Sequence, residues 1–348
     1  MDIKSMYIDE LSEWLKEKKQ PSFRAKQLYN WMHQKYVASV DEMTNLPKNL
    51  RDEIKTDGFM TISEELRQVS KKDGTTKFLF KLHDGQMIES VFMKYNYGNS
   101  ICISSQAGCR MGCRFCASTI GGLIRNLTAS EMLEQVYAAM RITGERISNI
   151  VVMGTGEPLD NYDNLIRFIK IISDEQGYNI SQRNITVSSC GIVPMIRKLA
   201  DEHLTITFAL SLHAPTDDER KKLMPIAYQY TLAETLDACK EYFEKTGRRI
   251  TFEYSLVKGQ NDTAEQANKL AELLKGMNCH VNLIPVNPIN ERDFEKSESD
   301  SIEKFKLILE KKSINGTIRR SVGSDIDAAC GQLRRKYVVN NQEESDEI

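Results

Sequence analysis

The feature that most constrains the fold is a regular alternation of strand-like and helix-like segments that begins near residue 101. Short apolar runs typical of buried strands alternate with longer segments in which apolar residues recur every three to four positions. The expected strands are 101–105, 147–153, 184–189, 205–212, 250–257 and 279–286. The expected helices are 130–143, 162–173, 193–200, 232–245, 264–275 and 301–311. This order predicts an α/β fold in which a parallel sheet and its right-handed crossover helices form a partial, open (βα)6 barrel over residues 101–322.

The chain before the barrel has two different patterns. Ile8, Leu11 and Leu15 share one helical face, as do Leu28, Trp31 and Met32, so residues 1–70 are expected to form a small helical domain. Two strand-like runs then flank Asp84 and Gly85, a dipeptide that favours a tight turn, and predict a β-hairpin linker over residues 71–100. After the barrel, residues 323–348 form a C-terminal segment that carries Cys330 and an acidic end.

Composition limits the class of protein. The chain has 348 residues, 41% of them hydrophobic and 28% charged, without an apolar run of the ~20 residues that a membrane span needs. Its first residues do not resemble a signal peptide, so we expect a cytoplasmic protein without membrane contact. We also expect a monomer. In that compartment, eight cysteines favour metal binding or catalysis over structural disulfides.

The formal net charge of −2 argues against a general nucleic-acid binder, because such proteins usually have a clear basic excess. Any contact with RNA must therefore come from local basic patches. Candidates in the helical domain are Lys16, Lys18, Lys19, Arg24, Lys26 and Lys35. Candidates for the barrel rim are Arg248, Arg249, Arg319, Arg320, Arg334 and Arg335. The alternative is that these side chains are ordinary solvated helix faces.

Three cysteines directly after the first barrel strand form the most specific motif. Cys109, Cys113 and Cys116 have a C-x3-C-x2-C spacing. A [4Fe-4S] cluster normally takes four thiolates, so three of them leave one iron open to a small molecule, which in radical S-adenosylmethionine (SAM) enzymes is SAM. A structural zinc site is the alternative, but it usually needs a second close pair of ligands. The remaining cysteines do not form such a pair: Cys102, Cys190, Cys239, Cys279 and Cys330.

Polar residues recur at the ends of the later strands. Because the carboxyl ends of barrel strands meet at one face, these residues are expected to converge on one cofactor pocket. The polar ones are Glu157, Ser188, Ser211, His213 and Asn287, and the strand ends also include Gly156 and Leu212 directly beside them. Singly, each could equally be a loop cap.

Two further cysteines and one acid lie outside these motifs. Cys330 is on a polar segment that follows the last strand and can fold over the barrel mouth, and Cys102 lies inside the first strand. Glu89 is a lone acid among apolar neighbours just before the barrel. For the cysteines the alternative is a small buried apolar side chain, and for Glu89 an exposed strand face.

The motifs together resemble those of the RlmN-type radical SAM methyltransferases nearly from end to end. The segments that carry the likeness are PSFRAKQLYNWMHQK, ISSQAGCRMGCRFCAS, MGTGEPLDNYDN, SLHAPTDDERKKLMPI, HVNLIPVNP and GSDIDAACGQLRRK. The sister group, the Cfr-like C8 methyltransferases, shares the cluster and both outlying cysteines, but Pro158 and the stretch 282–287 favour the RlmN type. Ser189 and Cys190 depart from the usual pattern.

The resemblance implies a radical SAM barrel and a role for each matching residue. Cys109, Cys113 and Cys116 would hold the cluster, and the strand-end residues would line the SAM site. Cys330 would be methylated by one SAM, and a radical made from a second SAM would activate that methyl group. The activated carbon would add to adenine, Glu89 would accept the C2 proton, and Cys102 would release the product by forming a disulfide with Cys330.

The implied substrates are C2 of an adenosine in 23S ribosomal RNA, at the peptidyl transferase centre, and of the adenosine 3′ of the anticodon in tRNA. A flavodoxin or ferredoxin would supply electrons. Two alternatives remain at this point. One is C8 methylation, and the other is a non-catalytic RNA-binding protein that senses redox state through Cys102 and Cys330.

Overall fold

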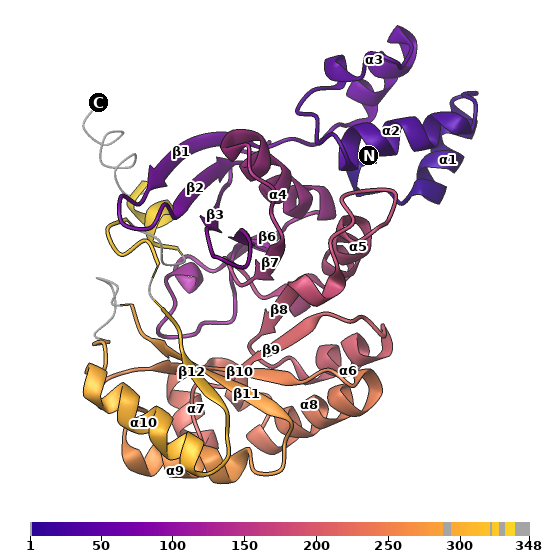
Figure 1. The fold of residues 1–348 in the computed structure, drawn as a ribbon. Helices are drawn as coiled ribbons and strands as arrows, with labels where there is room; N and C mark the ends of the chain where they lie inside the picture. Colours follow the sequence, from indigo (N-terminus) through magenta and orange to yellow (C-terminus); the bar gives the residue numbers. More distant parts are fainter. Residues whose placement is uncertain (1, 288–293, 321, 327–330, 338–348) are drawn as a thin grey trace.

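The computed structural model describes residues 2–287, 294–320, 322–326 and 331–337. Within them, the main element is one ten-stranded sheet in the order β1-β2-β3-β4-β7-β8-β9-β10-β11-β12 (Figure 1). Neighbours from β4 to β12 pair in parallel, whereas β1 to β4 pair antiparallel. The parallel strands are β4 (Ser100–Cys102), β7 (Asn149–Val152), β8 (Ile185–Ser189), β9 (Thr207–Ser211), β10 (Ile250–Leu256), β11 (Cys279–Pro285) and β12 (Gly316–Ile318).

The crossover helices cover the outer face of the parallel strands (Figure 1). They are α4 (Ala129–Thr143), α5 (Tyr162–Ile172), α6 (Val193–Asp201), α7 (Asp217–Leu223), α8 (Leu232–Thr246), α9 (Ala264–Leu273) and α10 (Ser299–Lys311). Local sequence fixes several ends: Thr128 and Thr231 begin α4 and α8 with capping boxes, and Gly144 and Gly247 end them in the left-handed conformation. The predicted α/β partial barrel is thus confirmed.

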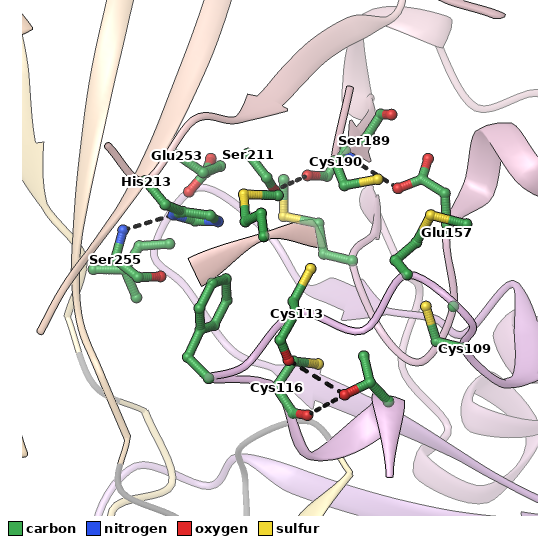
Figure 2. A pocket seen from close by; sticks show the side chains of 18 of the residues that line it. Cys109, Cys113, Cys116, Glu157, Ser189, Cys190, Ser211, His213, Glu253 and Ser255 are labelled. Atoms are coloured by element: carbon green, nitrogen blue, oxygen red, sulfur yellow. Dashed lines mark hydrogen bonds between the residues drawn. The ribbon is translucent and has the colours of Figure 1, made fainter. Parts of the chain in front are cut away.

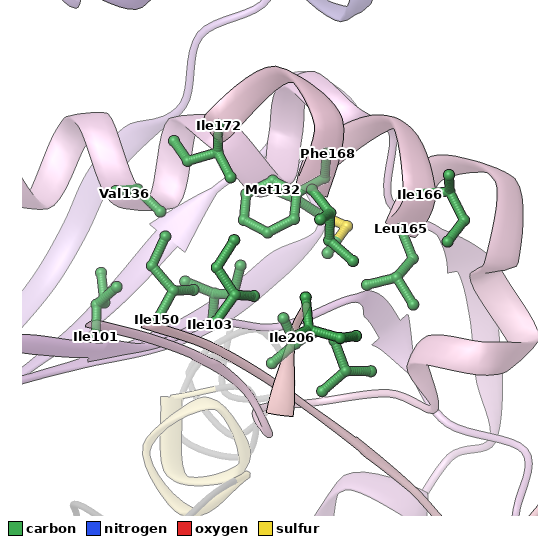
Figure 3. Packing of buried hydrophobic residues seen from close by; sticks show 14 of the residues in the cluster. Ile101, Ile103, Met132, Val136, Ile150, Leu165, Ile166, Phe168, Ile172 and Ile206 are labelled. Carbon is green, nitrogen blue, oxygen red and sulfur yellow. The ribbon is translucent and has the colours of Figure 1, made fainter. Parts of the chain in front are cut away.

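The hydrophobic core lies between the sheet and these helices. Figure 3 shows Met132 and Val136 of α4 and Phe168 of α5 above Ile101 and Ile150 of the sheet, and all five are buried. Alternate residues of the same strands point to the other face. Cys102 on β4 and Val151 on β7 therefore contact the inside of the barrel instead. The sheet thus separates an apolar core from a lumen where a site can form.

Three antiparallel strands extend the barrel sheet at its β4 edge. They are β1 (Ser63–Val69), β2 (Thr76–Lys81) and β3 (Met87–Met93), and β3 pairs with β4. The hairpin expected around Asp84 and Gly85 is present, with Gly85 at φ +82°. It is continuous with the barrel sheet, however, and is not a separate linker. Residues 63–69, which were predicted to belong to the helical domain, form the edge strand β1.

The N-terminal helices α1 (Ile8–Glu17), α2 (Phe23–His33) and α3 (Lys48–Asp57) form a group beside α4 and α5 (Figure 1). A fully buried ion pair joins this group to α4, with Lys4 Nζ 2.5 Å from Glu134 Oε1. His33 on α2 also contacts α4, because its Nδ1 lies 3.0 Å from the hydroxyl of Tyr137. Among the described residues, none of the helices is long and apolar enough to cross a membrane.

Candidate active site

The three-cysteine loop runs from β5 (Gln106–Gly108) to a short 3-10 helix, η3 (Ala117–Thr119). Its backbone is tightly folded, since the amide of Cys116 donates to the carbonyl oxygen of Cys113. The hydroxyl of Thr119 donates to the carbonyl oxygens of Cys113 and Cys116, at 3.2 and 2.9 Å. Gly108 has φ +78°, and a Cβ there would lie 2.1 Å from the carbonyl oxygen of Gly122. Only glycine fits at the start of this loop.

The loop closes one end of a cavity of about 270 Å³ that lies at the carboxyl ends of the parallel strands (Figure 2). This position is where barrel enzymes place their chemistry. Cys109, Cys113 and Cys116 all line the cavity, and Phe115 packs edge-on against His213 with ring centres 4.7 Å apart. Burial raises the pKa of Cys109 to about 12 and also raises that of Cys113, so both thiols are protonated until a metal binds.

The geometry of these thiols fits an iron–sulfur cluster. A structural zinc site usually has four protein ligands, and these three thiols are one short of that number. A multi-iron cluster fits three thiols on one cavity wall, because each cysteine can bind a different iron. Cys109, Cys113 and Cys116 are therefore the residues that would hold the cluster.

Glu157 is a buried carboxylate that follows β7 and lines the same cavity. Its two oxygens accept the amides of Leu159, at 3.0 Å, and Cys190, at 2.7 Å, as Figure 2 shows for Cys190. Desolvation raises the pKa of Glu157, and the Cys190 amide opposes that shift. The carboxylate is thus held rigidly at the cavity, where a substrate ammonium group could bind it.

The two glycines before Glu157 serve packing within the protein. A Cβ on Gly154 would lie 2.7 Å from the carbonyl oxygen of Ile103, and one on Gly156 would lie 2.7 Å from the Gln106 side chain. Both close contacts are between the end of β7 and the segment that leads into the cluster loop. Glu157 and the cysteines are held together by this contact.

The other predicted strand-end residues divide into two groups. Ser188, Ser211, His213 and Asn287 line the cavity together with Gly156 and Glu157, and the hydroxyls of Ser188 and Ser211 lie 3.4 Å apart. Leu212 is instead fully buried in the core and meets the site only through its backbone.

His213 is held in the unusual left-handed conformation, at φ +59°. Its Nδ1 accepts the amide of Ser255 at 2.9 Å, which assigns the proton of the neutral ring to Nε2. Burial lowers the pKa of His213 to about 3, so the ring is neutral at physiological pH.

Some residues of the site were not predicted. Arg220 on α7 is fully buried and donates to the carbonyl oxygens of Cys190 at 2.7 Å and of Ser211 and Leu212 at 3.3 Å. It thereby joins the ends of β8 and β9. In the sequence, Arg220 is one charge within DDERKKL, so no signal marks it as buried.

Glu253 was also missed as a cavity residue, and Arg319 was expected only at the barrel rim. Glu253 of β10 is buried at the cavity and accepts the Asn282 amide at 2.9 Å. Burial raises the pKa of Glu253, and Arg319 opposes the shift. Arg319 lines the cavity, whereas Arg248 and Arg249 precede β10 and so lie at the opposite end of the barrel from the site. These two candidates for the barrel rim are thus away from the cavity.

Cys102 and Glu89 lie on the same face of the sheet. Val91 of β3 is paired with Cys102, and Glu89 is two residues before Val91. The side chain of Glu89 is 3% exposed, so the exposed-face alternative is wrong. Glu89 Oε2 accepts the Lys77 ammonium at 2.9 Å and the Gly331 amide at 2.5 Å, and Oε1 accepts the Arg334 amide at 2.6 Å. Cys330 itself lies outside the described residues.

Some basic residues of the helical domain form ion pairs within the protein, which makes them less available for contact with RNA. Lys18 pairs with Asp57 at 2.8 Å, and exposed Lys16 lies near Glu13. Lys19 and Lys26 are exposed. Next to α2, cations and aromatic rings alternate: the Arg24 guanidinium lies 4.9 Å from the ring of exposed Phe23, and the Lys35 ammonium lies 3.5 Å from the ring of Trp31.

Comparisons with known proteins agree with this geometry. The family model of the Radical SAM superfamily matches residues 103–274, and that of the ribosomal RNA large subunit methyltransferase N-terminal domain matches residues 1–58. Radical SAM enzymes use a [4Fe-4S] cluster and SAM, which is the cofactor pair that the cavity residues fit.

Similar proteins match over almost the whole chain. The probable dual-specificity RNA methyltransferase RlmN of Lachnoclostridium phytofermentans is 60% identical, over 97% of this chain and 95% of its own. That of Lachnospira eligens is 59% identical over 99% of both chains. The crystal structure of a radical SAM methyltransferase from Sphaerobacter thermophilus matches with a TM-score of 0.92 and 43% identity, over 95% of this chain and 98% of that one. The chain therefore belongs to the RlmN family of dual-specificity RNA methyltransferases, within the radical SAM superfamily.

Proposed function

We propose that this RNA methyltransferase adds a methyl group to carbon 2 of adenosine, in 23S ribosomal RNA at the peptidyl transferase centre and in tRNA 3′ of the anticodon. The methyl group would travel on Cys330. One observation carries the proposal: the Gly331 amide, next to Cys330 in the chain, donates to Glu89, which shares a sheet face with Cys102. The methyl carrier, the proton acceptor and the resolving thiol would thus meet beside the cluster loop.

The chemistry of adenine requires such an arrangement. Carbon 2 lies between two ring nitrogens and is electron-poor, so it does not attack the methyl group of SAM as an ordinary nucleophile. The cluster, when bound, supplies the electron that cleaves SAM and so provides a hydrogen-abstracting radical. The protein would supply the other groups: a thiol that carries the methyl group, a base that takes up the proton, and a second thiol that releases the product.

The roles of the three residues follow from their chemistry. The Cys330 thiolate takes the methyl group of one SAM, which leaves as S-adenosylhomocysteine. Once the activated carbon is joined to adenine, the C2 proton is lost, and one electron would return to the cluster, which gave up one electron in the cleavage of SAM. Glu89 is suited to accept that proton, because it is a carboxylate that contacts the chain directly after Cys330.

Release of the product is assigned to Cys102. Its thiolate attacks the Cys330 sulfur, the sulfur–carbon bond to the RNA breaks, and the carbon keeps the electron pair and takes up a proton to become the methyl group. The two cysteines are left as a disulfide, which cellular thiols reduce. Cys102 is 5% exposed and packs in the lumen with Val91 and Met93, so only a group inside the barrel can reach it.

The compartment, the oligomeric state and the electron donor of the enzyme are also proposed. We place it in the cytoplasm as a monomer that receives electrons from a flavodoxin or ferredoxin. The target adenosine must be unstacked to enter the cavity, which favours RNA loops as substrates.

The decisive experiment uses the reconstituted protein with SAM, a reductant, and fragments of 23S ribosomal RNA and tRNA. Mass spectrometry of the digested RNA should find 2-methyladenosine, with S-adenosylhomocysteine and 5′-deoxyadenosine as the two products of SAM. 8-Methyladenosine in its place would establish the Cfr-like alternative. RNA binding without consumption of SAM would establish the redox-sensor alternative.

Cysteine variants test the route. Cys330→Ala should form no methylated RNA, whereas Cys102→Ala should accumulate a covalent protein–RNA adduct that denaturing gels detect. Cys239→Ala is the matched control, because Cys239 is fully buried in the hydrophobic core and should leave turnover intact. Repeated turnover by Cys102→Ala at the wild-type rate would rule out the two-cysteine route.

A further inference from the structure

The antiparallel extension formed by β1, β2 and β3 holds the C-terminal segment at two places. The first is the turn between β1 and β2. There, Asp73 accepts the Gly323 amide at 2.8 Å, and Asp325 accepts the Ser70 hydroxyl at 2.6 Å and the Lys71 amide at 2.9 Å. These contacts join residues more than 240 positions apart in the chain. We call this extension the cradle, because it holds the chain at Gly323 and Asp325.

The second place is buried. Glu89 of β3 accepts the amides of Gly331 and Arg334, and Lys77 of β2 donates to the same carboxylate. The side chains of Lys77 and Glu89 are 0% and 3% exposed. One buried ion pair therefore lies under the segment that begins directly after Cys330.

Gly331 is fixed from its other side by the cluster loop. It has φ +79°, and a Cβ at this position would lie 2.9 Å from the Ser118 amide nitrogen and 3.0 Å from Ala117 Cβ. Ala117 and Ser118 follow Cys116 directly. Gly331 therefore lies between the Glu89 carboxylate and the end of the cluster loop, and a shift of either contact would move the neighbouring peptide unit.

Lys77 determines how well Glu89 can act as an acceptor. A hydrogen bond to an ionised carboxylate is about twice as strong as one to a neutral acceptor. A buried carboxylate stays ionised only when it is paired, and removing one partner of a buried pair leaves the other charge uncompensated. Lys77 does not line the cavity, and its contact with the Glu89 carboxylate connects it to the segment that follows Cys330.

We propose that Lys77 is a positioning residue for methyl transfer: through Glu89 it fixes Gly331, and with it the methyl-carrying Cys330, against the cluster loop. The part played by Cys330 rests on the proposed function, whereas the docking of residues 331–337 does not. This difference allows the two to be tested separately.

The test compares Lys77→Met with Lys77→Arg and with Lys4→Met in the full-length protein. Lys4 and Glu134 form a second buried pair, 2.5 Å apart and 0% exposed, which joins the N-terminal helices to α4. Lys4→Met therefore controls for loss of a buried charge. Hydrogen exchange of residues 331–337 reads out docking, and it requires neither cofactor nor substrate.

Lys77→Met should increase amide exchange in this segment by about tenfold or more, because two hydrogen bonds to a charged acceptor weaken. Lys77→Arg should restore protection, and Lys4→Met should leave it unchanged. With the reconstituted enzyme, Lys77→Met should also yield more 5′-deoxyadenosine for each RNA methylated, because cleavage of SAM continues while the carrier is misplaced. Lys4→Met should keep the wild-type ratio.

Unchanged exchange, or an unchanged ratio of 5′-deoxyadenosine to methylated RNA, in Lys77→Met would overturn the proposal. If Lys77→Met does not fold, Lys77→Met combined with Glu89→Gln removes the unpaired charge. In that double variant, restored folding with rapid exchange of residues 331–337 supports the proposal, and full protection overturns it. Product formation by Cys330→Ala would instead refute the proposed function and leave the docking result standing.

Discussion

Arg220 illustrates how much the site depends on one side chain that contacts only backbone. Arg220→Met removes the donor to the carbonyl oxygens of Cys190, Ser211 and Leu212. Because these bonds are charge-assisted and buried, the free energy of unfolding should fall by about 2–4 kcal/mol. The ends of β8 and β9 should also separate, which raises the KM for SAM. Denaturant titration and steady-state kinetics measure the two effects.

Arg197 provides the comparison for this prediction. It lies on α6 and pairs with Glu241 at 3.0 Å, but both side chains are more than one third exposed. Arg197→Met should change the free energy of unfolding by less than about 0.5 kcal/mol. Equal losses in the two variants would mean that the carbonyl contacts of Arg220 are unimportant.

Glycine 108 allows a second test at the residue scale. Gly108→Ala puts a methyl group against the Gly122 carbonyl oxygen, so the loop must open and the protein should retain much less iron and sulfide after reconstitution. Gly122→Ala is matched in backbone, with φ +71°, but its Cβ meets open space and should cost only about 1–2 kcal/mol. If both variants bind a full cluster, the close contact at Gly108 does not shape the loop.

The sequence identifies site residues only where chemistry leaves a pattern. The spacing of Cys109, Cys113 and Cys116 and the polar strand ends are such patterns, and the structure brings nearly all of these residues to one cavity. Leu212 was included as a neighbour of His213, but successive residues point to opposite sides. Arg220 was missed because burial of a charged helix residue depends on distant partners.

At the scale of elements, the predicted strands and helices are those with strong periodicity. The α8 prediction of 232–245 compares with an observed Leu232–Thr246, because the capping box and terminal glycine are local signals. β1 was missed since its SEELRQV sequence has charges on an exposed edge, where alternation is not required. β12 spans only Gly316–Ile318, too short for any period to appear.

The junction of α2 and α4 should make stability depend on pH. Burial lowers the pKa of His33 from 6.5 to about 3, so the unfolded chain binds a proton in this range that the folded protein excludes. The contribution of His33 is complete above pH 6.5 and is lost as the pH falls toward 3, at about 1.4 kcal/mol per pH unit. His33→Phe should reduce the slope of the free energy of unfolding against pH between pH 6 and 5.

His203 is the control for this slope, because it is exposed after α6. His203→Phe should leave the pH dependence as in the wild type. An unchanged slope in His33→Phe would show that the ring is not buried as a neutral group. Urea titrations at several pH values provide the measurement.

At the scale of the molecule, RNA must reach the cavity, and the N-terminal helices offer an aromatic and basic surface on which we expect it to bind. We define this as the α2 patch: Phe23, Arg24, Lys26, Trp31 and Lys35. Replacing Lys26 and Lys35 by Ala should weaken RNA binding and reduce the slope of log K against log salt by up to about 2, because two phosphate contacts are lost. Fluorescence anisotropy over a range of salt concentrations measures this slope.

Lys240 and Lys269, exposed on α8 and α9, form the control pair for the α2 patch. Their double replacement should leave the salt slope unchanged. If it lowers the slope as much as the α2 variant does, binding follows overall charge and the patch has no special part. Substitution is preferable to deletion, because the N-terminal helices share the buried Lys4–Glu134 pair with the barrel.

The barrel could be predicted as a whole because each strand and helix pair is a local unit that repeats along the chain. The union of the hairpin with the barrel could not, since the pairing of β3 with β4 depends on which sheet edge is free. The contact between Glu89 and Gly331 joins residues that are 242 positions apart in the chain, so no periodic pattern in the sequence predicts it.

That distance has a consequence for biosynthesis. Chains fold from the N-terminus as they are made, so the hairpin and the cluster loop can form while residues 331–337 are still unmade. The Glu89 carboxylate of the cradle can accept its backbone amides only after residues 331–337 have been made. A nascent molecule can therefore complete its cofactor-holding loop first, and under the proposed function it methylates RNA only after residues 331–337 have been made.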